Sequence, residues 1–260
     1  MNGRALANKK PRTPQPPRGG GGKQPPRVQA PRARAGDDLG RRHGKLLYWA
    51  AGGGAVLLAV IVVAVALGTG GGSGGGDKKV AAAMSAAGCS FKTVTASVPK
   101  GQGTHVNSLT AKLPWNTSPP SNGQHYPEWA VWGFYTQAVN PRMVVHNEEH
   151  GGVVYWWGSQ VPQSTVAALH TLYNDQPVGT FGTPYPSLGS KVAVTAWTGD
   201  SSRYGLKGYY GEGHIGICSG WTPKVEKAFV AFRDKYRGHG PEGIPLCDDH
   251  PGDSPQQGSC

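Results

Sequence analysis

Residues 143–157 read MVVHNEEHGGVVYWW, and this stretch decides the fold prediction for the chain. Two runs rich in β-branched and aromatic residues, Met143–His146 and Val153–Trp157, flank a polar centre that closes on Gly151 and Gly152. Such a pattern predicts a β-hairpin or a strand–loop–strand unit. The motif HNEEH also matches the HxxEH pattern of one class of metalloproteases, but that motif requires a helix, which the β-prone flanks disfavour.

Strand-like runs outnumber helix-like runs in the surrounding sequence. Beyond the two runs above, the predicted strands are Ala130–Tyr135, Lys191–Trp197 and Gly208–Ile217. The predicted helices are Ala81–Ala87, which is rich in alanine, Pro162–Asn174, and Thr222–Tyr236, which begins with an N-cap threonine and a proline. We therefore expect an α+β domain with a mainly antiparallel sheet and two or three helices packed on one face.

Positive charge is concentrated at the N-terminus. The formal net charge is +11, and residues 1–45 hold 12 Lys/Arg and 2 Asp, which leaves +1 for the remaining 215 residues. This balance disfavours a folded nucleic-acid-binding domain with a basic face, so no nucleic-acid partner is expected. Residues 1–45 are rich in Pro, Gly and Arg and are expected to be disordered. Their role is either to orient the chain in a membrane or to contact anionic lipid.

Residues 46–68 read LLYWAAGGGAVLLAVIVVAVALG and carry no charged side chain. A helix needs about 20 residues to cross the hydrocarbon core, so this run is long enough for a transmembrane helix. The basic flank before it predicts a cytoplasmic N-terminus, with residues 69–260 on the outer side. A cleaved signal peptide is the alternative, but its apolar region would be shorter and nearer the start of the chain. The expected localisation is single-pass anchoring in the cell membrane.

The sequence thus divides into five parts. They are a disordered basic cytoplasmic tail (1–45), a transmembrane helix (46–68), a Gly/Ser-rich linker (69–79), an extracytoplasmic α+β domain (80–238) and a Cys-containing C-terminal tail (239–260). All four cysteines follow the apolar run, on the predicted oxidising side, and an even number there implies disulfides with three possible connectivities. Local closure of Cys247 with Cys260 would leave Cys89 with Cys218, and this is the pairing that we expect.

Histidines mark the predicted functional region. Four of them, His105, His125, His146 and His150, lie in the most patterned third of the predicted domain. Imidazole is the commonest side-chain metal ligand. If HNEEH is extended, His146, Glu148 and His150 share one face and offer half of a zinc or copper site. The alternative is that the same side chains form a buried hydrogen-bonded network without a metal.

Five segments, GCSFKTV, GTHV, SPPSNGQHYPEWAVWGFY, VVHNEEHGGVVY and SKVAVTAWTG, occur in this order. Together they resemble an uncharacterised membrane-anchored bacterial family known as domain of unknown function 3105. The resemblance covers about residues 88–235 and implies an envelope protein with one anchor, without implying a particular activity. The residues that match the family pattern are His105, His125, His146, Glu149 and His150. The resemblance therefore favours Glu149 over Glu148 as the acid, and a turn at Asn147–Glu148 would reconcile this with the strand prediction.

Three functions are compatible with this pattern. The first is an extracytoplasmic domain that binds zinc or copper through the His/Glu cluster. The second is a structural or interaction domain of the cell envelope in which no metal is bound. The third, which is less favoured, is a hydrolase that uses histidine and Glu149 as acid and base. An enzyme is therefore not the leading expectation, and protein partners are not specified by the sequence.

Overall fold

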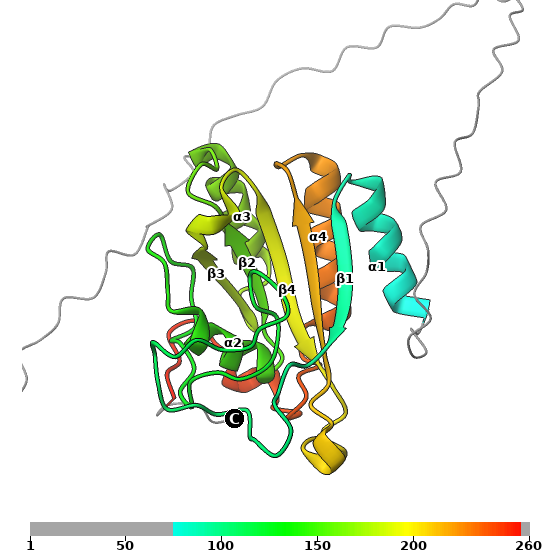
Figure 1. Ribbon diagram of the computed structural model, residues 1–260. Helices are drawn as coiled ribbons and strands as arrows, with labels where there is room; N and C mark the ends of the chain where they lie inside the picture. Colours follow the sequence, from blue (N-terminus) through cyan, green and yellow to red (C-terminus); the bar gives the residue numbers. More distant parts are fainter. Residues whose placement is uncertain (1–74, 256–260) are drawn as a thin grey trace, which may run out of the picture. The chain divides into compact units, whose positions relative to one another are not determined.

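The computed structural model describes residues 75–255 (Figure 1). In chain order its helices and strands are α1 (Gly75–Ala86), β1 (Ser90–Thr95), α2 (Pro141–Glu149), β2 (Val153–Trp157), α3 (Gln163–Asp175), β3 (Thr180–Pro184), β4 (Val192–Thr198), β5 (Glu212–Cys218) and α4 (Pro223–Tyr236). None of the described helices is long and apolar enough to cross a membrane. The predicted basic tail and the predicted transmembrane helix 46–68 lie outside the described residues.

The strands form one five-stranded sheet in the order β1-β5-β4-β2-β3. Three of its four pairings are antiparallel, and only β2 and β3 run parallel, joined through α3. A parallel pair requires such a crossover connection, whereas antiparallel neighbours do not. The fold is therefore the predicted α+β class with a mainly antiparallel sheet, although residues 75–255 contain four α-helices rather than two or three.

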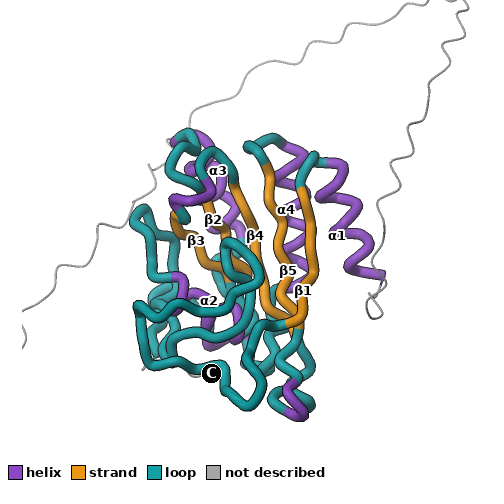
Figure 2. Tube along the Cα trace, viewed as in Figure 1, coloured by secondary structure: helices purple, strands orange, loops and turns teal. Residues whose placement is uncertain are grey.

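Both faces of the sheet are covered (Figures 1 and 2). On one face, β2 and β4 pack against α1, α3 and α4 through Val153, Tyr155 and Val194. On the other face, Val154 and Trp156 pack against α2 and the long connection between β1 and α2. Successive strand residues point to opposite faces, which explains why β2 is apolar throughout. The helices are thus not confined to one face as predicted, because α2 lies on the second.

The prediction of a strand at Met143–His146 is wrong, because these residues belong to α2. Asn140 caps this helix by accepting a hydrogen bond from the Arg142 backbone N–H, and Pro141 occupies the first turn. The helix ends before Gly151, whose φ of 101° favours glycine. Burial of the two valines of α2 against the sheet outweighs their β propensity.

Of the other predicted helices and strands, most are confirmed, one is wrong and two observed strands were missed. The strands Val153–Trp157, Lys191–Trp197 and Gly208–Ile217 and the helices Pro162–Asn174 and Thr222–Tyr236 correspond to β2, β4, β5, α3 and α4 with shifted ends. Helix α1 begins at Gly75, before the predicted Ala81 and inside the predicted linker. The predicted strand Ala130–Tyr135 is wrong, since in it only Phe134 forms an isolated bridge, to Gly182. Strands β1 and β3 were not predicted.

The disulfide between Cys89 and Cys218 is present, as predicted. It joins the residue before β1 to the last residue of β5, and these two strands are paired antiparallel with Ser90 opposite Ile217. The bond therefore fastens the start of the domain to the sheet. The pairing of Cys247 with Cys260 stays a prediction, because Cys260 lies outside the described residues.

Candidate metal centre

The predicted ligands converge beside α2. His146, Glu149 and His150 are three and four residues apart on a helical segment, so their side chains share one face. His105 and His125 come from the loops that surround α2 in Figure 2 and pair with one another in an isolated bridge. The His125 backbone N–H donates to Thr104 over 2.8 Å, which fixes the two loop segments side by side.

The centre of the group is Oε2 of Glu149. It lies 2.9 Å from Nε2 of His125, 3.5 Å from Nε2 of His105 and 4.0 Å from Nε2 of His146. These four donor atoms all lie within 4.8 Å of one another. Tetrahedral zinc with nitrogen and oxygen ligands at about 2.0–2.2 Å separates its donor atoms by about 3.4 Å. The donors therefore surround one point, but the most distant pair, up to 4.8 Å apart, must close by up to about 1.4 Å to hold zinc.

Two backbone carbonyls set the hydrogen positions on the imidazoles. Nδ1 of His125 lies 2.8 Å from the Gly123 carbonyl oxygen, and Nδ1 of His146 lies 3.1 Å from the Tyr126 carbonyl oxygen. A carbonyl oxygen only accepts, so each Nδ1 donates its hydrogen and the neutral ring directs a lone pair from Nε2 into the cluster. This is the orientation that metal-binding histidines adopt.

Two buried atoms in the cluster are unsatisfied. Nε2 of His125 and Oε2 of Glu149 lie 2.9 Å apart, within ion-pair distance, but no hydrogen bond joins them. Within the described part of the chain neither atom has a hydrogen-bond partner. Buried polar atoms in native proteins almost always have a hydrogen-bond partner, so two neighbouring atoms without one are unusual. A cation bound between them would satisfy both.

The electrostatics of the cluster suit metal binding. Burial would raise the pKa of Glu149, but the imidazoles of His105 and His125 and the hydroxyl of Tyr204 outweigh burial and hold that pKa below its usual range. Burial, with the nearby His125 and His150, lowers the pKa of His146 to about 3. At neutral pH the carboxylate is therefore ionised and His146 is neutral, as metal ligands must be.

A second set of donors adjoins the first. Nε2 of His150 lies 3.1 Å from Nε2 of His146 and 3.5 Å from Oε2 of Glu242, and these three residues form a further group with metal-ligand spacing. Glu242 belongs to the segment after α4, which passes beside α2 (red in Figure 1). Sequence reasoning missed Glu242, and its only signal is a lone acid in the Gly/Pro-rich run GHGPEG.

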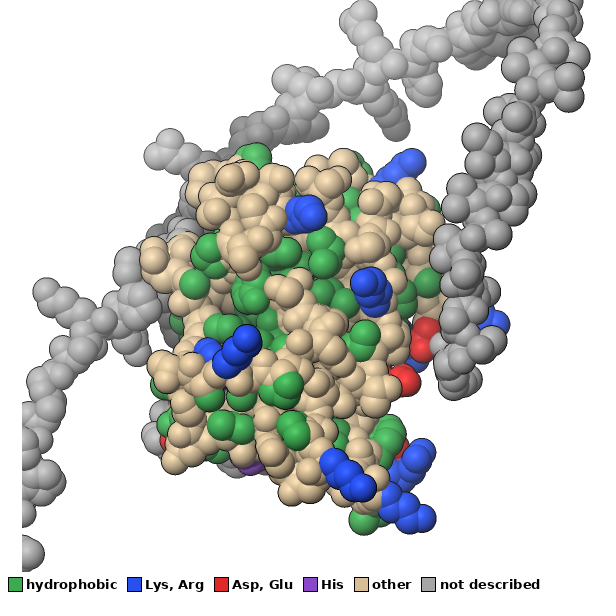
Figure 3. Space-filling view, in the orientation of Figure 1, with side chains coloured by type: hydrophobic (Ala, Val, Ile, Leu, Met, Phe, Trp, Pro, Cys, Tyr) green, Lys and Arg blue, Asp and Glu red, His purple; other side chains and the backbone are tan. Residues whose placement is uncertain are grey.

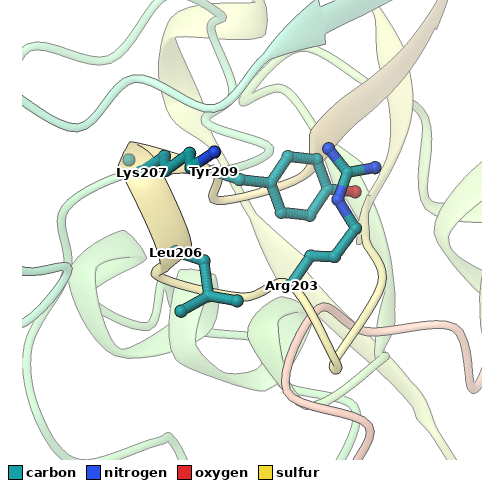
Figure 4. Close-up of a pocket in the computed structure, with 5 residues that line it drawn as sticks. Arg203, Leu206, Lys207 and Tyr209 are labelled. Atoms are coloured by element: carbon teal, nitrogen blue, oxygen red, sulfur yellow. The ribbon is translucent and has the colours of Figure 1, made fainter.

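Tyr204 also escaped the sequence analysis. It lies in the loop between β4 and β5, and its hydroxyl donates to Oε1 of Glu149. The carboxylate is thereby held with Oε2 toward the imidazoles. The same loop forms the hollow in Figure 4, where Arg203 lies over the ring of Tyr209. None of the predicted ligands lines this hollow.

Glu148 takes no part in the cluster. Its side chain is fully buried, and burial raises its pKa well above the usual range. The prediction that His146, Glu148 and His150 share one face is wrong, because it assumed an extended chain and a helix turns about 100° per residue. Glu149, which the family resemblance favoured, is the glutamate that lies among His105, His125 and His146.

The cluster is mostly enclosed but reaches solvent on one side. The side chains of His125 and Glu149 are 0% exposed, whereas those of His105 and Glu242 are 46% and 29% exposed. In the face shown in Figure 3, histidine contributes only a small patch near the lower edge. Trp129 covers the cluster, with its ring centre 4.7 Å from that of His150 and 5.6 Å from that of His146.

Comparison with known proteins gives one match. Residues 105–207 match the family described as a protein of unknown function (DUF3105), which confirms the resemblance and identifies these residues as a domain of that family. The matched range begins at His105 and contains all five predicted ligands and Tyr204, but it ends before Glu242. No curated protein and no solved structure matches the chain.

Proposed function

We propose that this domain of the DUF3105 family binds one transition-metal ion through His105, His125, His146 and Glu149. The observation that carries the proposal is the buried pair formed by Nε2 of His125 and Oε2 of Glu149, which lie 2.9 Å apart with no hydrogen-bond partner among the described residues. Leaving one such buried group unsatisfied costs about 1–3 kcal/mol. An ion between the two atoms removes that cost and supplies binding energy.

The donor set favours zinc or copper. Imidazole nitrogens suit both metals, whereas magnesium and calcium prefer oxygen ligands throughout. Because Tyr204 occupies Oε1 of Glu149, the carboxylate binds through Oε2 alone. Three imidazoles and one carboxylate oxygen then complete a four-coordinate site.

The proposed setting is the outer surface of the cell membrane, with residues 46–68 as the anchor and the basic tail against anionic lipid on the cytoplasmic side. Two observations support it. The Cys89–Cys218 disulfide is typical of domains that fold in an oxidising compartment. Lys and Arg cluster before the apolar run, as they do on the cytoplasmic side of membrane spans.

Metal-dependent hydrolysis is the second candidate. HNEEH occupies the last turn of α2 and its C-cap residue, His150, and is therefore helical, as the HxxEH metalloproteases require. His146, His150 and Glu242 offer the two histidines and one glutamate of a catalytic zinc site. Glu149 would then be the general base. Both oxygens of Glu149 already contact Tyr204 or the imidazoles, which leaves neither available to a water molecule. We therefore favour Glu149 as a metal ligand over Glu149 as a general base. Cleavage of a general protease substrate by the zinc-loaded chain, lost in Glu149→Gln, would reverse this preference.

Metal analysis of the full-length chain, purified without a histidine tag, tests the proposal. After equilibration with zinc or copper and removal of loose ions, we expect one ion per chain and a higher melting temperature than in chelator. His125→Gln removes one ligand and should weaken binding by about 10–100-fold or more. His170→Gln, on α3 and outside the cluster, is the control and should bind normally. A wild-type chain that holds no metal and melts equally with metal and with chelator supports the metal-free polar network instead.

A further inference from the structure

The two donor sets share one atom, Nε2 of His146. It lies 4.0 Å from Oε2 of Glu149 in the inner set and 3.1 Å from Nε2 of His150 in the outer set. Nδ1 of His146 is committed to the Tyr126 carbonyl, so this imidazole has a single lone pair to offer. The inner set (His105, His125, His146, Glu149) and the outer set (His146, His150, Glu242) therefore cannot both use His146 at the same time.

Each set has one donor that reaches solvent. In the inner set His105 is 46% exposed while His125 and Glu149 are fully enclosed, and in the outer set Glu242 is 29% exposed. Glu242 can therefore meet a hydrated ion before the enclosed ligands can, on a route separate from that through His105. His150 lies between, 3.5 Å from Glu242 and 3.1 Å from His146, so the donors form a continuous series from solvent to the inner set.

We propose that the outer set is an exchange position, through which a single zinc or copper ion enters and leaves the inner set with His146 as the pivot. This inference rests on the proposed function. The step is a ligand exchange without electron transfer. The bonds from the ion to Glu242 and His150 break as bonds to Glu149, His125 and His105 form, and the bond to His146 is kept. The domain is then a carrier that loads and releases its ion, rather than one that holds it permanently.

The hydrogen bonding of the cluster without an ion supports this exchange. Since His146 directs a lone pair from Nε2, the 3.1 Å contact requires His150 to donate from its own Nε2. An ion in the inner set occupies that lone pair and ends this hydrogen bond. His150 can then turn toward Glu242, so the outer donors are ready to take the same ion back when it leaves the inner set.

Copper capture by the full-length chain provides the test, with Trp129 beside both outer histidines as the fluorescent reporter. Capture of Cu²⁺ and its release to excess chelator are followed by stopped-flow quenching in the wild type, His150→Gln and Glu242→Gln. Both variants should slow capture and release by about tenfold, and affinity should stay nearly constant because it is the ratio of the two rates. Glu226→Gln on α4 and His170→Gln on α3 are the controls and should match the wild type.

Three results would overturn the exchange position. They are lower affinity at an unchanged capture rate, unchanged rates in both variants, and two ions bound to one wild-type chain. A further variant tests whether the outer set binds copper when the inner set has lost a ligand. His125→Gln should retain weak copper binding that disappears on adding Glu242→Gln, and a His125→Gln chain that is folded but binds no copper contradicts an outer position. A wild-type chain that binds neither copper nor zinc refutes the proposed function itself.

Discussion

Tyr204 sets the orientation of the acid in the proposed site. Its hydroxyl donates to Oε1 of Glu149, which leaves Oε2 toward the imidazoles. Tyr204→Phe keeps the ring and removes the donor, so we expect metal affinity to fall by about 10–100-fold, as is usual when a ligand loses its supporting hydrogen bond. Competition with a chelator of known affinity measures the change. Tyr209→Phe in the same loop is the matched control, and equal affinity in all three proteins would contradict a positioning role for Tyr204.

Buried histidines should make the metal-free domain sensitive to acid. Burial lowers the pKa of His146 to about 3 and that of His214 to about 4, from 6.5 in the unfolded chain. Between pH 6.5 and about 4 these two histidines therefore bind more protons in the unfolded state, and their contribution to stability falls as pH falls, whereas Glu148, whose pKa is raised by burial, contributes in the opposite sense. Glu149 raises the pKa of His105, so the contribution of His105 to stability is lost above pH 6.5, as the pH rises.

Melting temperatures in chelator across pH 7 to 4.5 test this. His214→Gln, which lies outside the metal cluster, should lose less stability than the wild type between pH 6.5 and 4.5. His170→Gln should change the slope less than His214→Gln does, because burial also lowers the pKa of His170 but its side chain is less enclosed. Equal slopes in wild type and His214→Gln would show that another group causes the acid sensitivity.

The sequence predicted the five family-matching ligands but not their neighbours. His146, Glu149 and His150 are close in the chain, so one correctly assigned helix places them together. His105 and His125 were included because they lie in the same patterned third of the domain and match the family pattern, and no spacing rule connects them to α2. Glu242 and Tyr204 reach the cluster from loops without periodic pattern, and loop paths are set by tertiary packing that local sequence does not encode.

At the scale of elements, α2 shows why a local pattern misled. Val144 and Val145 beside a Gly pair favour a strand, while Asn140 and Pro141 signal a helix start. The helix forms because its valines and glutamates are buried against the sheet, which is a tertiary effect. Strand β3 (TFGTP) was missed for a related reason, since Gly and Pro hide an edge strand whose parallel partner is known only once the crossover through α3 is in place.

The loop after α4 packs closely on the end of α2. A Cβ at Gly240 would overlap the Glu149 carbonyl oxygen and the Gly151 nitrogen. Gly240→Ala should therefore push the loop and Glu242 away from His150, destabilise the domain by about 1–3 kcal/mol and slow copper capture. Urea unfolding and stopped-flow quenching measure the two effects. Gly220→Ala is the control, because no heavy atom lies within 4 Å of its Cβ, and equal stability of both variants would contradict the predicted overlap.

At the scale of the whole molecule, one disulfide closes a loop with a sequence separation of 129. Replacing both Cys89 and Cys218 with alanine should destabilise the domain by about 2–5 kcal/mol, as is typical when a native disulfide is lost from a small secreted domain. Urea midpoints measured in oxidising buffer give the change. Adding reductant should lower the wild-type midpoint more than that of the double variant, which keeps only the predicted Cys247–Cys260 bond. A double variant with the wild-type midpoint would show that the bond adds no stability.

The orientation of the whole chain is tested by reporter fusion. An enzyme that is active only outside the cytoplasm should be active when it is fused after Cys260, because residues 46–68 follow a strongly basic flank. The same enzyme fused after Lys45, before the apolar run, should be silent. A cytoplasmic reporter that is active at the C-terminus would contradict the proposed topology.

The donors of the proposed site come from separate segments of the chain, and this separation fixes when the proposed ion would be acquired. The inner set needs the segments of His105 and His125 packed against α2, with Tyr204 of the β4–β5 loop on Glu149. A nascent chain therefore offers no complete set of ligands. In a domain that folds outside the cytoplasm, as proposed here, the identity of the first ion is decided by the supply in the surroundings and not by the metal pools of the cell interior.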